Sequence, residues 1–361
     1  MVETRYSRAA ELARGLGDRE GLFRALFGLR SSALARGALE PADGLSHELL
    51  ELATALDDTD LSVEAHLALG NTAFQLGEFS RARRHLEYAV AAFDPKRSER
   101  HALHFGIDPG VFCRALLAMT LHLLGYSAQA LHQSEEACRI AHQGGHAYSR
   151  CTAENFAAWL AVMRDEPVRC LEHATLAGEI AGTAGFPSAV VLAEIRGGWA
   201  RNRSGGIEVG IAEIRAGLEK WRNLGAVLGL PHFLALLARA CRTADATVEA
   251  AVVIDEAVHA AEQTGERWAL SELYRLRGDV LRDQGAPCAV VAAAYEQAIA
   301  NARSQGALYW ELEAVLALAS LNSAQGLREE AKTAVQSVYE KFDDGLDMPI
   351  LAATRRFLME P

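Results

Sequence analysis

Residues 67–95 read LALGNTAFQLGEFSRARRHLEYAVAAFDP. Apolar residues recur at helical spacing on both sides of Gly77, so the stretch predicts two helices joined by a tight turn. Three small residues, Gly70, Ala82 and Ala89, lie on faces that otherwise carry Leu, Phe and Tyr. Small side chains let two helix backbones approach closely, and large neighbours fill the space beside them. The stretch therefore predicts one helical hairpin.

Breaks between helices recur along the chain at a nearly constant spacing. The breaks between successive hairpins are 40, 40, 40 and 41 residues apart, at Gly145, Gly185, Gly225, Gly265 and Gly306. A second series of breaks falls inside the hairpins, at Gly125, Asp165, Gly205, Asp245, Gly285 and Gly326. A fixed period of this size is typical of stacked supersecondary units and not of one globular core.

The pattern predicts eight hairpins. Their first helices are expected at residues 20–36, 61–76, 109–124, 148–164, 188–203, 229–243, 267–283 and 308–325. Their second helices are expected at residues 41–56, 79–93, 127–143, 168–184, 207–224, 247–264, 288–305 and 328–342. The expected fold is an all-α, right-handed superhelical solenoid of about eight tetratricopeptide-like hairpins, with an open curved trough along its concave side.

The whole chain, 1–361, is expected to form this single solenoid. Residues 1–18 are expected to be an N-terminal partial repeat, and residues 347–361 to contain a C-terminal capping helix. Residues 94–107 interrupt the repeat period and are expected to be an insertion loop. Irregular loops of this length often carry functional residues, so this segment is a weak indication of a functional site.

Composition narrows the function classes. The formal net charge of −11 disfavours sequence-independent nucleic-acid binding, which needs a basic surface. The six cysteines form no CxxC pair, as expected of small apolar residues packed in a reducing cytosol. The start of the chain is charged from its third residue, unlike a signal peptide, and no stretch approaches 18 uncharged apolar residues. We therefore expect a cytoplasmic protein without nucleic-acid or membrane partners.

Catalytic and metal-binding motifs are not found in the sequence. There is no GxSxG and no GxxxxGK[ST]. His142 and His146 are four residues apart, but the intervening QGG ends a helix, so they share no helical face. His101 and His104 lie in the insertion near Asp108, where an ordered surface loop is the favoured interpretation. We expect no enzyme activity, no cofactor and no metal.

Several motifs resemble one family. They are DPGV at 108–111, LLGY at 123–126, GFP at 185–187, GW at 198–199, PHFLALLA at 231–238, GERWALSELYRLRGDVL at 265–281 and VYEKFDDGLDMPIL at 338–351. Together they resemble the C-terminal tetratricopeptide (MalT-like) region of large bacterial signalling proteins. Those proteins place a class III nucleotide cyclase or a LuxR-type DNA-binding domain, and then a P-loop ATPase, before this region. The resemblance implies an excised sensor domain or a stand-alone relative.

The repeat register predicts which residues face the trough. The candidate ligand-binding residues are Asn71, Phe74, Gln75, Phe112, Met119, His122, Asn155, Trp159, Trp199, Arg203, His232, Arg239, Arg242, Arg275, Asp279 and Arg282. The arginines suit a carboxylate or a phosphate. In the alternative interpretation they pair with Glu272, Asp279 and Asp283, and the tryptophans pack between helices.

The expected function is non-catalytic recognition of a protein, a peptide or a small effector with an acidic group. The resemblance implies control of an attached or partner ATPase, cyclase or transcription regulator. Two alternatives stay open: a scaffold that assembles into oligomers, and an enzyme whose site is roofed by residues 94–107. The sequence leaves the ligand and the oligomeric state open.

Overall fold

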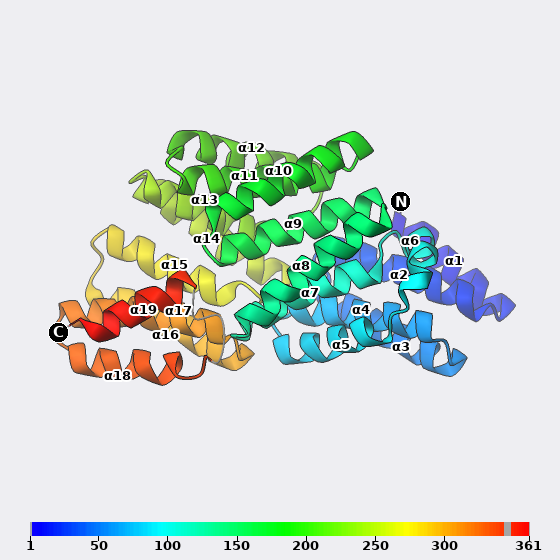
Figure 1. The fold of residues 1–361 in the computed structure, drawn as a ribbon, viewed down its shortest axis with the longest axis horizontal. Helices are drawn as coiled ribbons and strands as arrows, with labels where there is room; N and C mark the ends of the chain where they lie inside the picture. The colour runs from blue at the N-terminus through cyan, green and yellow to red at the C-terminus, as the bar shows by residue number, and fades with distance from the viewer. Residues whose placement is uncertain (1, 343–347, 361) are drawn as a thin grey trace.

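The computed structural model describes residues 2–342 and 348–360, and within these ranges the chain is helical without a strand. Eight consecutive helical hairpins form the array (Figure 1). Their first helices are α2 (Arg19–Ala35), α4 (Thr59–Gln75), α7 (Pro109–Leu123), α9 (Ala147–Met163), α11 (Pro187–Arg203), α13 (Leu230–Thr243), α15 (Leu270–Asp283) and α17 (Leu308–Ala324). Their second helices are α3 (Leu39–Leu56), α5 (Phe79–Ala92), α8 (Ser127–Gly144), α10 (Pro167–Ala184), α12 (Ile207–Asn223), α14 (Thr247–Thr264), α16 (Cys288–Gln305) and α18 (Arg328–Tyr339).

These helices confirm the predicted fold class, and their ends lie within three residues of the predicted ones. Helix α1 (Val2–Leu16) packs on α2, and α19 (Pro349–Met359) packs on α18. The turns explain the Gly and Asp rhythm, because each turn needs one residue with a positive φ. Gly77 supplies it at φ 75°, and Asp165 and Asp245 supply it at φ 55°.

The segment 94–107 differs from the predicted insertion loop. It contains a 3₁₀ turn, Pro95–Arg97, and a two-turn helix, α6 (Ser98–Phe105). The side chain of Asp94 caps the 3₁₀ turn by accepting a hydrogen bond from the N–H of Lys96 at 3.0 Å. The Phe105 ring packs edge-on against Phe27, with ring centroids 5.0 Å apart. The segment folds because its apolar residues find a partner on α2.

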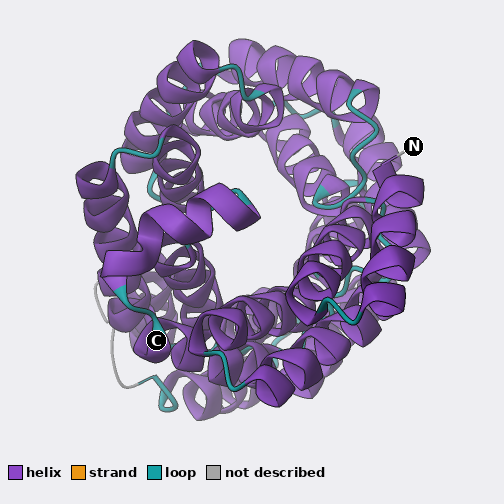
Figure 2. Ribbon diagram, turned by 90° about the vertical axis from the view of Figure 1, so that its right-hand side faces the viewer, coloured by secondary structure: helices purple, strands orange, loops and turns teal. Residues whose placement is uncertain are grey.

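The superhelix curves tightly enough for hairpins that are distant in the sequence to contact each other. Viewed along the long axis, the helices surround a central space (Figure 2). The N–H of Arg267 donates to the carbonyl oxygen of Gln75 at 2.8 Å, and the Tyr309 hydroxyl donates to the carbonyl oxygen of Met163 at 2.5 Å. The first helices of the second and fourth hairpins thus contact the turns that lead into the seventh and eighth. The trough is therefore partly closed, and not open along its length as the sequence predicted.

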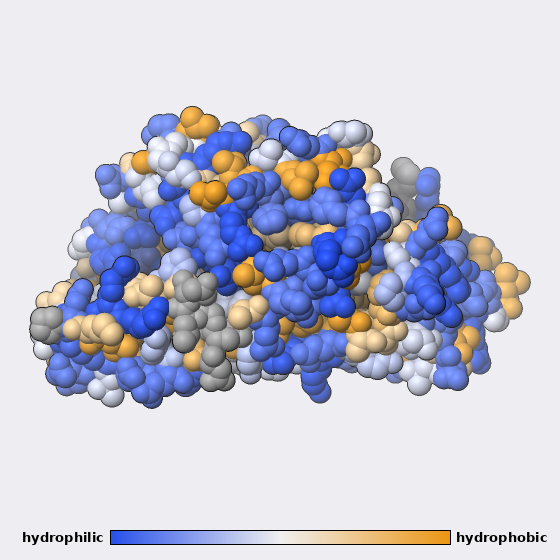
Figure 3. Space-filling view, viewed as in Figure 1, coloured by the Kyte–Doolittle hydropathy of each residue, from blue (hydrophilic) through white to orange (hydrophobic). Residues whose placement is uncertain are grey.

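Most of the face seen in Figure 1 is covered by hydrophilic side chains (Figure 3). In the part of the chain that the structure describes, no single helix has the length and apolar character needed to cross a bilayer, although residues 95–105 and 109–123 pass that test together as one sharply bent pair.

Candidate functional site

A cavity of about 820 Å³ lies inside the superhelix. It is enclosed by α2, α4, α7, α9, α11 and α13, together with the residues that follow α6. Its walls are largely aromatic and come from six different elements: Phe27, Phe112, Phe156, Trp159, Trp221, Phe233 and Trp268. The volume lies within the range of pockets that hold small molecules or peptide side chains.

Two buried arginines line this cavity without a carboxylate partner. Arg30, on α2, donates to the carbonyl oxygen of Ala68 at 2.8 Å and to the Thr72 hydroxyl at 3.0 Å. Arg196, on α11, donates to Oδ1 of Asn155 at 2.9 Å. No carboxylate oxygen among the described residues lies within 4.0 Å of either guanidinium. Burial lowers the pKa of each arginine to about 10, so both stay charged at neutral pH.

Arg196 also lies over an aromatic wall. Its guanidinium carbon is 5.6 Å from the centre of the Trp159 ring, a cation–π distance. Asn155 fixes the arginine from the other side, since its own Nδ2 donates to the carbonyl oxygen of Ala189 at 3.1 Å. The Arg196 head is therefore held in place and still has an Nε without a hydrogen-bond partner.

Several other polar atoms around the cavity are buried without a hydrogen-bond partner in the described protein. Besides Nε of Arg30 and of Arg196, they are Oε1 of Gln75, Nε1 of Trp159, Nε1 of Trp221 and Nε2 of His232. A folded protein leaves few such atoms unsatisfied, because each costs about 1–3 kcal/mol. All six atoms belong to residues that line this one cavity, which makes it the candidate binding site.

The floor of the cavity is an aromatic cluster around His232. The His232 ring centroid lies 5.7 Å from that of Trp159 and 5.0 Å from that of Trp268. Burial, and then the charges of Arg196 and Arg239, lower the pKa of His232 to about 3, so its imidazole is neutral at neutral pH. Nε1 of Trp268 donates to Glu266 at 2.7 Å, which fixes the indole.

Glu266 anchors this floor. Its second carboxylate oxygen accepts a hydrogen bond from the N–H of Gly229 at 2.9 Å. Burial raises the pKa of Glu266 to about 7, although both hydrogen bonds oppose the rise. Both oxygens of this carboxylate are thus occupied in holding Gly229 and Trp268 in place.

The predicted site residues divide into three groups. Those that line the cavity are Asn71, Gln75, Phe112, Asn155, Trp159 and His232. Those packed in the protein core are Phe74, Met119, His122 and Trp199. The third group, Arg203, Arg239, Arg242, Arg275, Asp279 and Arg282, lies outside this cavity, where its charges pair with one another and with neighbouring carboxylates.

Short ion pairs hold this charged third group. Arg242 reaches Asp279 at 2.9 Å and Asp283 at 2.6 Å, and Arg275 reaches Asp279 at 2.8 Å. Arg203 pairs with Asp165 at 2.6 Å. These guanidinium groups behave as in the alternative interpretation, in which they pair with carboxylates of this chain.

Sequence reasoning missed Arg30 and Arg196. Both lie inside apolar stretches, FRALFGLRSSALA at 23–35 and VVLAEIRGGWA at 190–200. A lone arginine on the apolar face of a helix is the signal that could have found them, because a buried charge needs a partner. The arginines of the third group were predicted instead because the repeat register places them together on the concave face.

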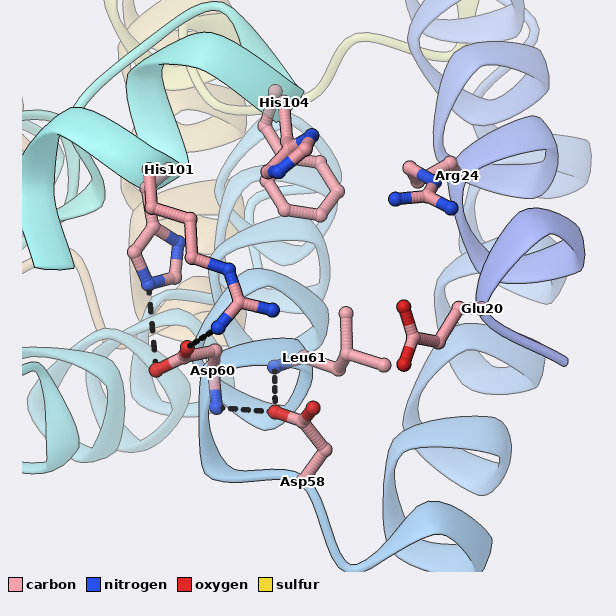
Figure 4. A pocket seen from close by; sticks show the side chains of 9 residues that line it. Glu20, Arg24, Asp58, Asp60, Leu61, His101 and His104 are labelled. Atoms are coloured by element: carbon pink, nitrogen blue, oxygen red, sulfur yellow. Dashed lines mark hydrogen bonds and ion pairs between the residues drawn. The ribbon is translucent and has the colours of Figure 1, made fainter.

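Helix α6 covers one edge of the cavity. Phe105, Gly106 and Ile107, at its end, line the cavity. On its outer side, Figure 4 shows a small pocket lined by His104 of α6 and by Glu20 and Arg24 of α2, whereas the His101 ring turns to Asp60 of α4. The residues 94–107 therefore roof part of the concave side.

A buried acid and imidazole attach α6 to α4. Nδ1 of His101 lies 2.6 Å from Oε1 of Glu64, and the carboxylate of Asp60 pairs with Arg97 at 2.6 Å. Burial raises the pKa of Glu64 to about 7. His101 is thus buried against α4 as part of a helix, where the sequence favoured an ordered surface loop.

Comparisons with known proteins agree with the helical-repeat fold. No family model matches the chain. The uncharacterized protein R02095 of Rhizobium meliloti (strain 1021) is 26% identical over 261 residues, which are 72% of this chain and 25% of that protein. The chain thus spans about a quarter of the length of this curated relative.

Two solved structures share the fold at low sequence identity. A Rap protein complexed with competence and sporulation factor has a TM-score of 0.59 at 12% identity, covering 93% of this chain and 96% of that one. The Rap conjugation gene regulator of plasmid pLS20, in complex with the Phr* peptide, has a TM-score of 0.59 at 9% identity, covering 99% and 96%. At such identities the likeness shows a tetratricopeptide-like helical-repeat fold and nothing further.

Proposed function

We propose that this chain is a non-catalytic regulatory module that binds a short acidic peptide in its central cavity. The observation that carries the proposal is the pair of buried arginines, Arg30 and Arg196, which line an aromatic cavity and have no carboxylate partner among the described residues. An acidic ligand supplies the missing partner, and charge-assisted hydrogen bonds to a guanidinium are stronger than neutral ones.

The other groups of the cavity suit a peptide. Asn71 and Gln75 lie one helical turn apart on α4, and an amide side chain can both donate to and accept from a peptide bond. Oε1 of Gln75 has no hydrogen-bond partner in the described protein. The aromatic walls offer apolar area to the peptide's side chains. Of the two Rap structures to which the chain is similar, one is complexed with competence and sporulation factor and the other with the Phr* peptide.

The regulatory part of the proposal follows from the shape. A ligand in the cavity contacts the first helices of several hairpins at once, and so favours one pitch of the superhelix over others. A change of pitch moves the two ends of the array relative to each other. The resemblance to MalT-like regions supports an ATPase, a cyclase or a transcription regulator as the controlled partner or attached domain.

The experiment is selection from a random peptide library on the immobilised chain, followed by calorimetric titration of the selected peptides. We expect selected peptides to share a carboxylate, either in Asp or Glu or at the C-terminus. The variant Arg196→Gln should lose this preference and bind at least about tenfold more weakly, since a buried charged pair contributes more than 1.4 kcal/mol.

The matched control is Arg203→Gln, since Arg203 is exposed, paired with Asp165 and outside the cavity. It should bind the selected peptides as the unmodified chain does. Selection of peptides without a common acidic group, or an equal loss in both variants, would contradict the proposal.

A further inference from the structure

Four side chains from two neighbouring hairpins converge away from the central cavity. Cys138 and His142 are four residues apart on α8, so they share one face of that helix. Glu154 comes from α9 and His173 from α10. The Sγ of Cys138, a carboxylate oxygen of Glu154 and a ring nitrogen of His173 all lie within 4.8 Å of one another.

Glu154 is the centre of this group, and only 2% of its surface is exposed. Its Oε2 lies 2.6 Å from Nδ1 of His173, and its Oε1 lies 2.7 Å from Nε2 of His142. The sequence places His142 and His146 four residues apart, but the helix end between them predicted no shared face and no metal. The structure instead turns His146 to Ser149, at 2.9 Å, and His142 to Glu154.

We propose that Cys138, Glu154 and His173 bind a zinc ion. A thiolate, an imidazole nitrogen and a carboxylate oxygen are the three ligand types that zinc takes in proteins, at bond lengths of about 2.0–2.3 Å. In a tetrahedral site, such bonds place the ligand atoms roughly 3.3–3.8 Å apart. Zinc binding would therefore replace the 2.6 Å hydrogen bond between His173 and Glu154 with a longer separation, and would draw Sγ of Cys138 in from its present distance of at most 4.8 Å.

The remaining groups complete the site. His142 holds the carboxylate oxygen that faces away from His173, the position of a residue that orients a metal ligand from outside the coordination sphere. Cys138 and His173 both line a cavity of about 180 Å³, which has room for a water molecule as fourth ligand. The divalent charge offsets the two negative charges that thiolate and carboxylate bring together.

Such a site would cross-link two neighbouring hairpins. Cys138 belongs to the third hairpin, and Glu154 and His173 belong to the fourth. Metal binding to the folded state alone stabilises that state, in proportion to the logarithm of the free metal concentration. The proposal concerns stability of the array and is independent of the peptide cavity, to which none of the three ligands contributes.

The test begins with the full chain treated with a chelator and then titrated with Co²⁺ as a spectroscopic probe for zinc. We expect one Co²⁺ per chain, with a thiolate-to-cobalt charge-transfer band in the near ultraviolet, and displacement of the cobalt by Zn²⁺. A zinc titration against a chromophoric competitor then gives the affinity.

Variants identify the ligands. Cys138→Ser should abolish the charge-transfer band, whereas the control Cys288→Ser, at an exposed cysteine on α16, should keep it. His142→Ala should weaken zinc binding about 10- to 100-fold, and His173→Asn should weaken it more. Because His173 is partly exposed, its variant should still fold, which a helical circular-dichroism spectrum checks. A titration with no charge-transfer band, or a band that survives in Cys138→Ser, would overturn the proposal.

Discussion

The main-chain N–H of Arg267 donates a hydrogen bond to the main-chain carbonyl oxygen of Gln75 at 2.8 Å, across one turn of the superhelix. Gln75 ends the first helix of the second hairpin, and Arg267 precedes the first helix of the seventh. A repeat array usually joins only neighbouring repeats. Here distant repeats are joined too, and this contact lies beside Gln75 and Trp268, which line the cavity.

The hydroxyl of Tyr309 makes a second contact across the superhelical turn, and Tyr309→Phe removes it. The hydroxyl donates to the carbonyl oxygen of Met163 at 2.5 Å in a buried setting. We expect the free energy of unfolding to fall by about 1–2 kcal/mol, because a buried carbonyl loses its partner. Urea unfolding measures the change. The exposed Tyr88→Phe is the control, with a change below about 0.5 kcal/mol. Equal changes in the two variants would show that the contact across the turn contributes nothing.

Gly210 lies where α11 and α12 approach each other closely. A Cβ at this position would lie 2.4 Å from the carbonyl oxygen of Gly198 and 2.6 Å from the main-chain nitrogen of Asn202. Backbone atoms cannot move aside cheaply, so Gly210→Ala should force α11 and α12 apart. We expect a loss of about 1–3 kcal/mol in the free energy of unfolding.

Gly178 is the matched control for this substitution. A Cβ there would meet nothing closer than the Cβ of Ala193, at 3.6 Å. Because alanine favours helix over glycine, Gly178→Ala should stabilise the protein by about 0.5–1 kcal/mol. Thermal and urea unfolding compare the two variants. The opposite order of stability would mean that the small residues of the repeat do not set the helix spacing.

The repeat period made the helices predictable. Each turn needs a residue with a positive φ, and Gly and Asp supply it at positions such as Gly125 and Asp165, so the breaks appear in the sequence. The start of α7 follows the same local logic, because Asp108 before Pro109 is typical of a helix start and its side chain accepts a hydrogen bond from the N–H of Gly110. These features depend on neighbours in the sequence.

The contents of the cavity depend on contacts between distant repeats, which no local pattern encodes. The hydrogen bond between Arg267 and Gln75 joins main-chain atoms, so no residue type in the sequence predicts it. The register placed Asn71 and Trp159 on the inner face, and both line the cavity. It also placed Trp199 there, but the curvature of the array buries that ring in the core. A small difference between the predicted and the actual rotation of a helix about its axis therefore decides which inner residues a ligand could contact.

Substitution of Arg196 tests whether this residue serves ligand binding at the expense of stability. Within the described residues, the buried guanidinium has no carboxylate partner and its Nε has no hydrogen bond. We expect Arg196→Met to leave the free energy of unfolding unchanged or to raise it by about 1 kcal/mol, because a side chain of similar length replaces a buried charge. Binding of acidic peptides should be lost in the same variant.

Thermal unfolding with and without a selected peptide measures both effects of Arg196→Met. The unmodified chain should gain stability from the peptide, and the variant should not. A strong loss of stability without peptide would instead make Arg196 a residue that holds the fold.

His232 should make the protein sensitive to acid. Burial, and then the charges of Arg196 and Arg239, lower the pKa of its imidazole from 6.5 in the unfolded chain to about 3 in the folded one. Between these values the unfolded state binds more protons, so the stability from neutral His232 is present above about pH 6.5 and is lost as the pH falls. The loss amounts to about 2 kcal/mol between pH 6.5 and pH 5, since each pH unit contributes about 1.4 kcal/mol.

The variant His232→Phe isolates this effect. A phenyl ring fits the cluster with Trp159 and Trp268 and cannot bind a proton. We expect the variant to lose about 2 kcal/mol less stability than the unmodified chain when the pH is lowered to about 5. His122, whose pKa is also lowered to about 3 by burial, contributes equally in both proteins, so the difference belongs to His232. Urea unfolding at about pH 7.5 and pH 5 gives the four values required. Parallel losses in the two proteins would mean that the folded state accommodates a protonated His232, and that the floor of the cavity opens to water.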